Sequence, residues 1–436
     1  MRRWADQIPA SGPYTLADAR VPAAVADGLG AADAEGFVRA DIGIDGDKIG
    51  PPIGPRIDIG GAVVLPAFVD CHTHLDKGQI WARKANPDGT FGGAIHAVRA
   101  DRTTFWTAED VRTRMDFMLR CAYAHGTRAV RTHLDTGDHR TQSSWAVFRE
   151  MREVWAGRIA LQAVALVSVE QVAKPGFAEI ADLVASSGGV MGGVTYPMFN
   201  LDGLLDQLFD IAGSRGLSLD LHVDESLDPG SATLRKVAEA KARTGFDRAV
   251  TCGHCCSLAM QPETEAMRTI ERVAAAGIAV ISLPLCNLYL QDRAANRTPR
   301  ARGVTLVHEL AALGVPVAFA SDNTRDPFYA YGDLDMLEVM REATRIAHLD
   351  HPVSAWPAAF SRIPAAVMGI GGGVVVHDAP ADLVLVPARG WTELLSRPHP
   401  DRLVIRDGRA IAAEPPDYAE LDGLAGLANP LAAEAR

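Results

Sequence analysis

Short apolar runs alternate with longer amphipathic segments over most of the chain. Between about Leu65 and Met368, each apolar run is followed by a segment rich in Ala, Leu, Glu and Arg that has helical periodicity. We interpret eight of these runs as strands, and they span residues 62–74, 127–135, 159–166, 190–197, 217–225, 248–255, 278–285 and 315–322. Eight strands that alternate with helices predict an α/β fold with a (β/α)8 TIM barrel. A doubly wound open sheet is the alternative, but no Gly-x-Gly-x-x-Gly motif follows an early strand.

The two ends of the chain have a different pattern. Residues 37–64 and 382–412 contain short alternating runs broken by Gly, Pro and Asp, which is typical of hairpins. We therefore predict that both ends contribute to one small β-sandwich beside the barrel. The predicted domains are residues 1–64, the N-terminal part of the sandwich; residues 65–375, the barrel; and residues 376–436, the C-terminal part of the sandwich with a loosely packed tail.

The composition of the 436 residues, 48% hydrophobic and 22% charged, is that of a globular protein. The formal net charge of −11 argues against a nucleic acid or an anionic membrane as partner and leaves a small-molecule substrate open. The first residues lack the apolar segment of a signal peptide, and no apolar run approaches the roughly 20 residues of a membrane span. Six cysteines, with Cys255 and Cys256 adjacent, are typical of a reducing compartment. We expect a cytoplasmic protein. Homo-oligomers are common among such barrels, although the sequence shows no interface signal.

Two histidines one residue apart end the first predicted barrel strand. His72 and His74 lie in the stretch LPAFVDCHTHLDKGQ. Side chains at positions i and i+2 of a strand project from the same face, so both imidazoles point at one place. A single buried histidine is usually a hydrogen-bonded core residue, but two on one face indicate a metal ion.

Further polar residues end three other predicted strands. In a (β/α)8 barrel, function lies at the carboxyl ends of the strands. Here the fifth strand ends with His222, the sixth with His254 and the eighth with Asp322. Three imidazoles and one carboxylate suit Zn²⁺ or Fe²⁺ and leave a position for water. We predict one metal site with the ligands His72, His74, His222 and Asp322.

The fifth strand also supplies two candidates for a proton shuttle, Asp224 and Glu225. Asp224 shares the face of His222 if the strand stays regular. Glu225 reaches the site only if the strand ends earlier and the chain turns over the barrel mouth, and the pattern does not choose between the two. His133 and Asp135, which end the second strand, are interpreted equally well as pocket residues or as structural hydrogen-bonding partners.

Several segments together resemble the amidohydrolase superfamily, and specifically its cytosine deaminase branch. The resemblance runs through most of the barrel and rests on PAFVDCHTHLDK, RAVRTHLD, LHVDES, GHCCSLAM, PLCNLYLQDR and SDNTRDPFYAYG. It implies a distorted barrel, a terminal β-sandwich and one Fe²⁺ or Zn²⁺ held by the four predicted ligands. It also implies that Glu225 is the proton shuttle, that His254 orients the water or the substrate, and that Asp322 accepts a proton from the water. Two-metal members carry a bridging lysine on strand four, which the segment VMGGVTYP lacks, so a single metal ion is expected.

The implied reaction is hydrolytic deamination of an amino-substituted, pyrimidine-like heterocycle. Water attacks the amino-bearing ring carbon, Glu225 protonates the ring nitrogen, and ammonia leaves. The recognition segments depart from the cytosine-specific pattern, because Ser168 stands where a glutamine amide is expected and Phe328 where a tryptophan is expected. We predict that Ser168, Asp326 and Phe328 contribute to substrate binding, and that the ring need not be cytosine.

Two alternatives differ in their chemistry. The segment SDNTRD is closer to branch members that hydrolyse N-alkylated s-triazines such as N-isopropylammelide, although those typically lack the carboxylate that this chain keeps at Glu225. The second alternative is a catalytically silent barrel that acts as a binding protein. The complete set of four ligands and an acid argues against silence, because buried histidines and carboxylates are costly to keep without a function.

Overall fold

The computed structural model describes residues 4–427 and divides the chain into two compact units. The first unit comprises the chain up to Asp70 with Arg120–Ala129 and Leu334–Pro415, and the second comprises Cys71–Leu119, Val130–Asp333 and the chain from Pro416 onward. The second unit carries most of the barrel and all of the predicted site residues.

Eight strands form one sheet in the order of the chain, running from β6 to β13. The strands are β6 (Phe68–Thr73), β7 (Thr127–Asp135), β8 (Ala160–Leu166), β9 (Val190–Thr195), β10 (Leu219–Val223), β11 (Val250–His254), β12 (Ala279–Ser282) and β13 (Val317–Phe319). A parallel bridge between Thr73 and Asp322 links the first strand to the segment after the last one. The predicted (β/α)8 barrel is therefore confirmed.

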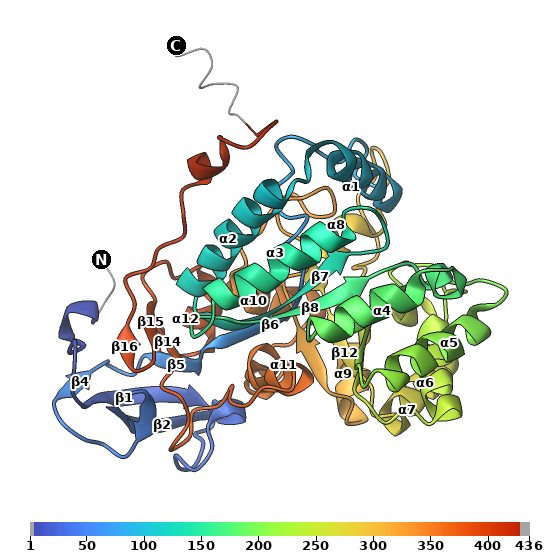
Figure 1. The fold of residues 1–436 in the computed structure, drawn as a ribbon. Helices are drawn as coiled ribbons and strands as arrows, with labels where there is room; N and C mark the ends of the chain where they lie inside the picture. The colour runs from blue at the N-terminus through green and yellow to red at the C-terminus, as the bar shows by residue number, and fades with distance from the viewer. Residues whose placement is uncertain (1–3, 428–436) are drawn as a thin grey trace. The chain divides into compact units, whose positions relative to one another are not determined.

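Amphipathic helices connect the barrel strands. They are α1 (Phe91–Phe105), α2 (Ala108–Ala124), α3 (Thr141–Val154), α4 (Phe177–Ser186), α5 (Leu201–Ser214), α6 (Thr233–Thr244), α7 (Glu263–Ala275), α8 (Pro284–Leu290) and α9 (Val307–Ala312). Helix α5 buries Leu201, Leu204, Leu205 and Leu208, which lie on one helical face. Figure 1 shows α4, α5, α6 and α7 side by side along one flank of the barrel strands. Helix α5 thus packs with its apolar face buried.

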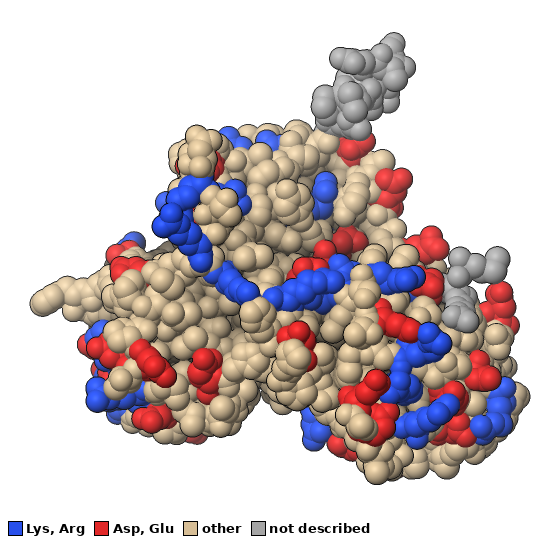
Figure 2. Space-filling model, turned by 180° about the vertical axis from the view of Figure 1, so that it is seen from behind, with Lys and Arg blue, Asp and Glu red and all other residues tan. Residues whose placement is uncertain are grey.

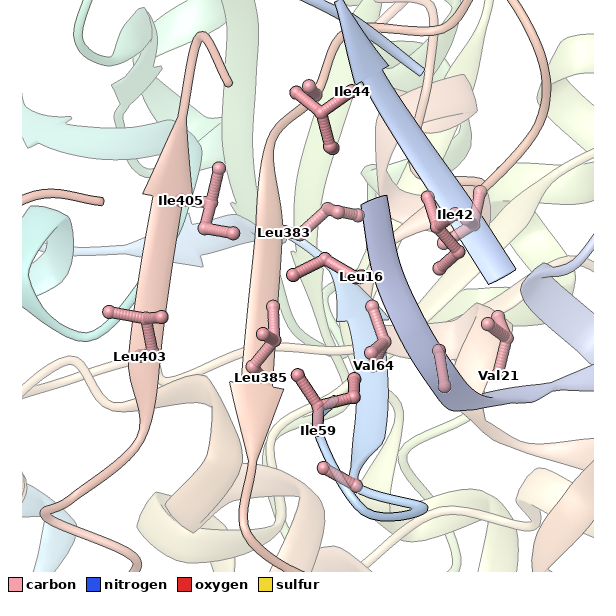
Figure 3. Packing of buried hydrophobic residues seen from close by; sticks show 14 of the residues in the cluster. Leu16, Val21, Ile42, Ile44, Ile59, Val64, Leu383, Leu385, Leu403 and Ile405 are labelled. Atoms are coloured by element: carbon pink, nitrogen blue, oxygen red, sulfur yellow. The ribbon is translucent and has the colours of Figure 1, made fainter. Parts of the chain in front are cut away.

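Both ends of the chain build the second sheet, as predicted. Its order is β16-β15-β14-β5-β1-β2-β3, and β4 pairs with β1. The strands are β1 (Tyr14–Pro22), β2 (Phe37–Asp45), β3 (Lys48–Gly50), β4 (Arg56–Asp58), β5 (Val63–Pro66), β14 (Leu383–Val386), β15 (Leu403–Arg406) and β16 (Arg409–Ala410). Figure 3 shows Leu16, Val64 and Leu383, from three of these strands, packed in one core. The remaining α-helices of this unit are α10 (Met336–Ala347), α11 (Arg362–Val367) and α12 (Trp391–Ser396).

Strand β1 lies inside this sheet but was not among the predicted strands. Its pairing register with β2 shifts between Leu16 and Ala19, and Asp18 there has a positive φ of 62°. A bulge of this kind interrupts the alternation of apolar and polar positions from which strands are recognised. The hydrophobic pattern was therefore too irregular to reveal the strand.

Charged side chains of both signs are mixed on the surface. On the face shown in Figure 2, Lys and Arg side chains lie among Asp and Glu side chains. Neighbouring helices α5 and α6 pair such charges directly, with Lys236 at 2.7 Å from Asp202 and Arg243 at 2.6 Å from Asp206. Among residues 4–427, no helix is both long and apolar enough to cross a bilayer.

Candidate metal and catalytic site

The carboxyl ends of the barrel strands bring the predicted ligands together. Asp322 Oδ1 lies 3.1 Å from His74 Nε2 and 3.6 Å from His72 Nε2. His222 Nε2 lies 3.5 Å from His74 Nε2. Donor atoms that share one ion, each at about 2.0–2.3 Å from it, have separations of this size. His72, His74 and Asp322 thus offer donor atoms within 4.8 Å of one another, and His222 belongs to a second such group with His72 and His254.

Burial keeps these histidines neutral. The side chains of His72, His74 and His222 are at most 6% exposed. Burial, reinforced by the neighbouring positive groups, lowers the pKa of each of them well below 6.5. A neutral imidazole has a ring nitrogen with a free lone pair, which is the form that binds a metal ion.

Several buried nitrogen atoms of the cluster lack hydrogen-bond partners within residues 4–427. They include both ring nitrogens of His72 and Nδ1 of His222. A buried polar atom without a partner costs about 1–3 kcal/mol. A cation bound to the imidazoles would remove part of this cost, so the residues present fit a divalent ion that prefers nitrogen and oxygen donors.

Asp322 is positioned by the closure of the barrel. Its backbone N–H donates to the carbonyl of His72 at 2.9 Å, and its own carbonyl accepts from Thr73 Oγ1 at 2.8 Å. The residue has a φ of 63°, in the left-handed region that residues other than glycine rarely adopt. The first and last strands thus together place the carboxylate beside His72 and His74.

Asp224 and Glu225 have different surroundings, although they are adjacent. The Asp224 carboxylate accepts hydrogen bonds from the side chains of Ser231 and Thr233 and from the backbone N–H groups of Thr233 and Leu234, at the start of α6. Its φ of 50° marks the end of β10. The Asp224 carboxylate is therefore engaged in fixing the loop between β10 and α6.

The Glu225 carboxyl group instead lies beside His254. Its Oε1 is 3.4 Å from His254 Nδ1 and 3.5 Å from Asn287 Nδ2. Burial, followed by the charge of Asp322, raises the pKa of Glu225 well above 4.5. A carboxyl group with a raised pKa can hold a proton at neutral pH and deliver it, as a general acid does.

Asn287 is a site residue that the sequence pattern did not reveal. It lies on α8, is 1% exposed, and places its Nδ2 3.1 Å from His254 Nδ1. Because an amide nitrogen only donates, Nδ1 accepts this hydrogen bond and the neutral ring carries its proton on Nε2. Burial lowers the pKa of His254 to about 3, which keeps the ring neutral. Asn287 thereby fixes both the orientation and the tautomer of His254.

Replacing Asn287 with leucine should reduce kcat by about 10–100-fold, the usual effect of removing a partner that orients a site residue. Leucine is similar in size but cannot donate to His254 or to Glu225. The measurement is steady-state turnover with the substrate proposed below. Asn200→Leu, at an exposed asparagine that makes no side-chain cap hydrogen bond, is a control for the general effect of the substitution. An unchanged kcat in Asn287→Leu would show that the tautomer of His254 is fixed in another way.

His133, which the sequence pattern left open as a pocket residue or a structural one, is fully buried beside the predicted ligands. Its ring centroid is 3.9 Å from that of His72, and its Nε2 is 3.9 Å from Asp220 Oδ1. The other Asp220 oxygen accepts from Arg131 at 2.8 Å. Burial raises the pKa of Asp220 to about 6. His133 therefore packs directly against the predicted metal ligand His72.

Lys77 and Asp135 form a second buried pair close to the site. Lys77 Nζ lies 2.9 Å from Asp135 Oδ1, and both side chains are largely shielded from solvent. Burial opposes the charge of Lys77, but Asp135 and Asp76 outweigh it and raise the pKa of the lysine. Burial and the charge of Asp135 raise the pKa of Asp76 to about 7. Lys77 therefore remains a cation, and its charge acts on Glu225.

Comparison with known proteins identifies the family of this chain. Residues 107–412 match the model of the Amidohydrolase family. The chain is 50% identical over 428 residues to a pterin deaminase from Rhizobium rhizogenes, a match that covers 96% of this chain and 98% of the relative. The chain belongs to the amidohydrolase family.

Two further similarities of this amidohydrolase are more distant. An N-isopropylammelide isopropyl amidohydrolase from a Pseudomonas species is 25% identical over 323 residues, which cover 68% of this chain and 74% of that protein. The solved structure of a 5-methylcytosine deaminase from Klebsiella pneumoniae has a TM-score of 0.77 and 24% identity, and covers 92% of this chain and 98% of that one. The similarity to the 5-methylcytosine deaminase structure supports the assignment of the fold.

In this amidohydrolase the three predicted substrate-binding residues have different surroundings. Ser168 Oγ, at the end of β8, lies 3.2 Å from the hydroxyl of Tyr196. Asp326 is buried, and its carboxylate accepts from the backbone N–H of Phe328 at 2.8 Å and from Asn323 Nδ2 at 2.6 Å. Burial raises the pKa of Asp326 to about 6. The carboxylate of Asp326 thus shapes the loop that carries Phe328.

Phe328 lies beside the buried lysine. Its ring is half-buried, lies 5.4 Å from Lys77 Nζ and packs edge-on against Phe91 with centroids 5.5 Å apart. An ammonium group within about 6 Å of a ring centroid is attracted to the ring. The predicted roles of Ser168, Asp326 and Phe328 in substrate binding stay predictions.

Proposed function

We propose that this amidohydrolase is a metal-dependent deaminase of pterins. The observation that carries the proposal is the 50% identity to a pterin deaminase over nearly the whole of both chains. The cluster of His72, His74, His222, Asp322 and Glu225 supports it, because hydrolytic deamination needs an activated water and a proton carrier.

Pterin agrees with the substrate class expected from the sequence. It is a bicycle in which a pyrimidine ring, with an amino group at C2 and an oxo group at C4, is fused to a pyrazine ring. Hydrolysis at C2 forms a bond from carbon to the water oxygen and breaks the bond to the amino nitrogen. The products are ammonia and 2,4-dioxopteridine. The narrower prediction, a cytosine-like pyrimidine, is tested below by comparing cytosine with pterin as substrates.

A divalent ion held by the four predicted ligands would supply a Lewis acid that lowers the pKa of its water to roughly 7. Protonated Glu225 donates to the ring nitrogen next to C2, which makes C2 more electrophilic. The resulting carboxylate then accepts a proton from the attacking water and passes it to the departing amino group. When the carbonyl group at C2 forms, the second proton of the water returns to Glu225 and restores its protonated form. The raised pKa of Glu225 suits the first of these steps.

His254 and Asp322 complete the proposed mechanism. His254 carries its proton on Nε2, a buried atom without a protein partner within residues 4–427, so it can donate to an oxygen of the water or the substrate. Asp322 lies close enough to His74 to act as a ligand and can also accept a proton from the water. Asn287 holds His254, and backbone hydrogen bonds to His72 and Thr73 hold Asp322, so both groups are positioned in advance.

The proposal is tested by measuring ammonia release from pterin by the purified protein loaded with Zn²⁺ or with Fe²⁺. Cytosine, isocytosine, 5-methylcytosine, creatinine and amino-s-triazines are compared under the same conditions. We expect the highest kcat/KM with pterin, because recognition of a bicycle uses more contacts than recognition of its pyrimidine half. A single-ring substrate with a higher kcat/KM would contradict the pterin assignment but keep the deaminase assignment.

The second candidate is hydrolysis of an N-alkylamino-s-triazine, which the similarity to the N-isopropylammelide hydrolase favours. The two reactions differ in the leaving group. N-isopropylammelide would release isopropylamine, which is separated from ammonia by chromatography. Isopropylamine release without ammonia from any heterocycle would establish this candidate. Stoichiometric metal without either product would instead support a binding protein.

A further inference from the structure

Cys286 lies at the site but has no role in the proposed deamination. It belongs to α8, which follows β12, and its side chain is fully buried. Its Sγ is 3.6 Å from Asn323 Oδ1. One carboxylate oxygen of Glu225, one of Asp322 and the sulfur of Cys286 lie within 4.8 Å of one another. A thiol therefore stands beside the proton carrier and a predicted metal ligand.

The spacing of these three donor atoms is close to that of three ligands of one cation. Three donors that each lie about 2.0–2.3 Å from one ion are roughly 3.3–4.0 Å apart, and the atoms of this cluster lie within 4.8 Å of one another. Small side-chain movements close the remaining difference. Glu225 is only partly buried, so a small ion can reach the cluster from the same side as a substrate. A sulfur with two carboxylates selects borderline or soft divalent ions over Mg²⁺ and Ca²⁺.

We propose that Cys286, Glu225 and Asp322 form a second, inhibitory binding site for a thiophilic divalent cation. Asp322 would be shared, since it also faces His72 and His74. The thiol proton is released to solvent when the bond between sulfur and the ion forms. The buried cation Lys77, which acts on Glu225, is itself paired with Asp135 at 2.9 Å, and this pairing reduces its repulsion of a bound ion.

A cation at this second site would inhibit the enzyme because it binds Glu225, the proposed proton carrier. A carboxylate that is bound to a cation cannot hold the proton that the ring nitrogen must receive. Occupation of the second site would therefore stop turnover while the first ion stays in place. This consequence rests on the proposed function, but binding of the ion does not.

The test is a titration of the metal-loaded protein with CdCl₂. A bond between cadmium and a thiolate gives a charge-transfer band in the ultraviolet, which is read as a difference spectrum without any substrate. We expect a band that saturates at one cadmium per subunit and is absent in Cys286→Ala. Glu225→Gln, which keeps the thiol, should retain the band with weaker binding. Cys121→Ala, at another buried cysteine that lies in the first unit, should behave like the unmodified protein.

Inhibition is measured in the same titration as ammonia release from pterin, relative to each variant without cadmium. Cys286→Ala should raise the half-inhibiting cadmium concentration by about tenfold or more. No band in the unmodified protein, or an equal band in Cys286→Ala, would overturn the proposal. If Cys286→Ala does not fold, Cys286→Ser replaces it. A band that depends on Cys286 in a protein without deaminase activity would keep the site and reject the proposed function.

Discussion

Glu225→Gln should reduce kcat/KM for ammonia release by about 10²–10⁴-fold, the range that general acid–base catalysis contributes. Glutamine has the same size and can keep contact with Asn287, but it cannot donate and recover a proton. The bound metal should stay at one ion per subunit, because Glu225 is not among the four predicted ligands. Steady-state kinetics with pterin and elemental analysis of the dialysed protein measure the two quantities.

The surroundings of Glu225 explain why a large effect is expected. Its carboxyl group lies against His254 and Asn287, and partial burial together with the charge of Asp322 raises its pKa. Asp224 cannot replace it, since its oxygens are engaged at the start of α6. Glu265→Gln, at an exposed glutamate of α7, is the matched control. If Glu225→Gln kept most of the activity, Glu225 would have no place in the mechanism.

Asp322→Asn should weaken metal binding and lower kcat/KM by more than the roughly 10–100-fold typical of an outer partner. Asparagine fits the same space and keeps the backbone hydrogen bond to His72 that closes the barrel. It removes the only negative charge among the four predicted ligands, so the ion loses its strongest electrostatic partner. The measurements are metal content after dialysis against a chelator and ammonia release after metal is restored.

A matched control separates metal loss from general destabilisation. Asp247→Asn makes the same substitution at an exposed residue and should leave metal content and activity unchanged. His222→Asn, which removes another predicted ligand, should weaken metal binding in the same way as Asp322→Asn. Full metal content and full activity in both ligand variants would show that the ion is held elsewhere.

The barrel was predictable because each strand is a short apolar run. Strand β7 spans the residues that the pattern predicted, Thr127–Asp135, whereas β13 is shorter than predicted and spans Val317–Phe319. The predicted range extended to Asp322, three residues past the end of β13, where the chain forms an isolated bridge with Thr73 instead of a regular strand. The apolar pattern records which residues are buried but not where the backbone leaves the sheet, and so the strand ends were less accurate than the strand order.

The sequence alone could not decide whether Asp224 or Glu225 reaches the site. A regular strand would have favoured Asp224, which shares the face of His222. In the structure β10 ends at Val223, Asp224 turns to the start of α6, and Glu225 reaches His254. This outcome depends on hydrogen bonds from residues seven to ten positions later in the chain, which no local pattern expresses.

The sequence by itself determined the number and order of the barrel strands and the identity of the polar residues at their ends, because both depend on local periodicity. Only the tertiary structure decided which of these side chains lie together. Asn287 meets His254, and Cys286 meets Glu225, across 33 and 61 positions of the chain. Such contacts depend on how neighbouring strands and their loops pack, and no single segment of the sequence specifies this packing.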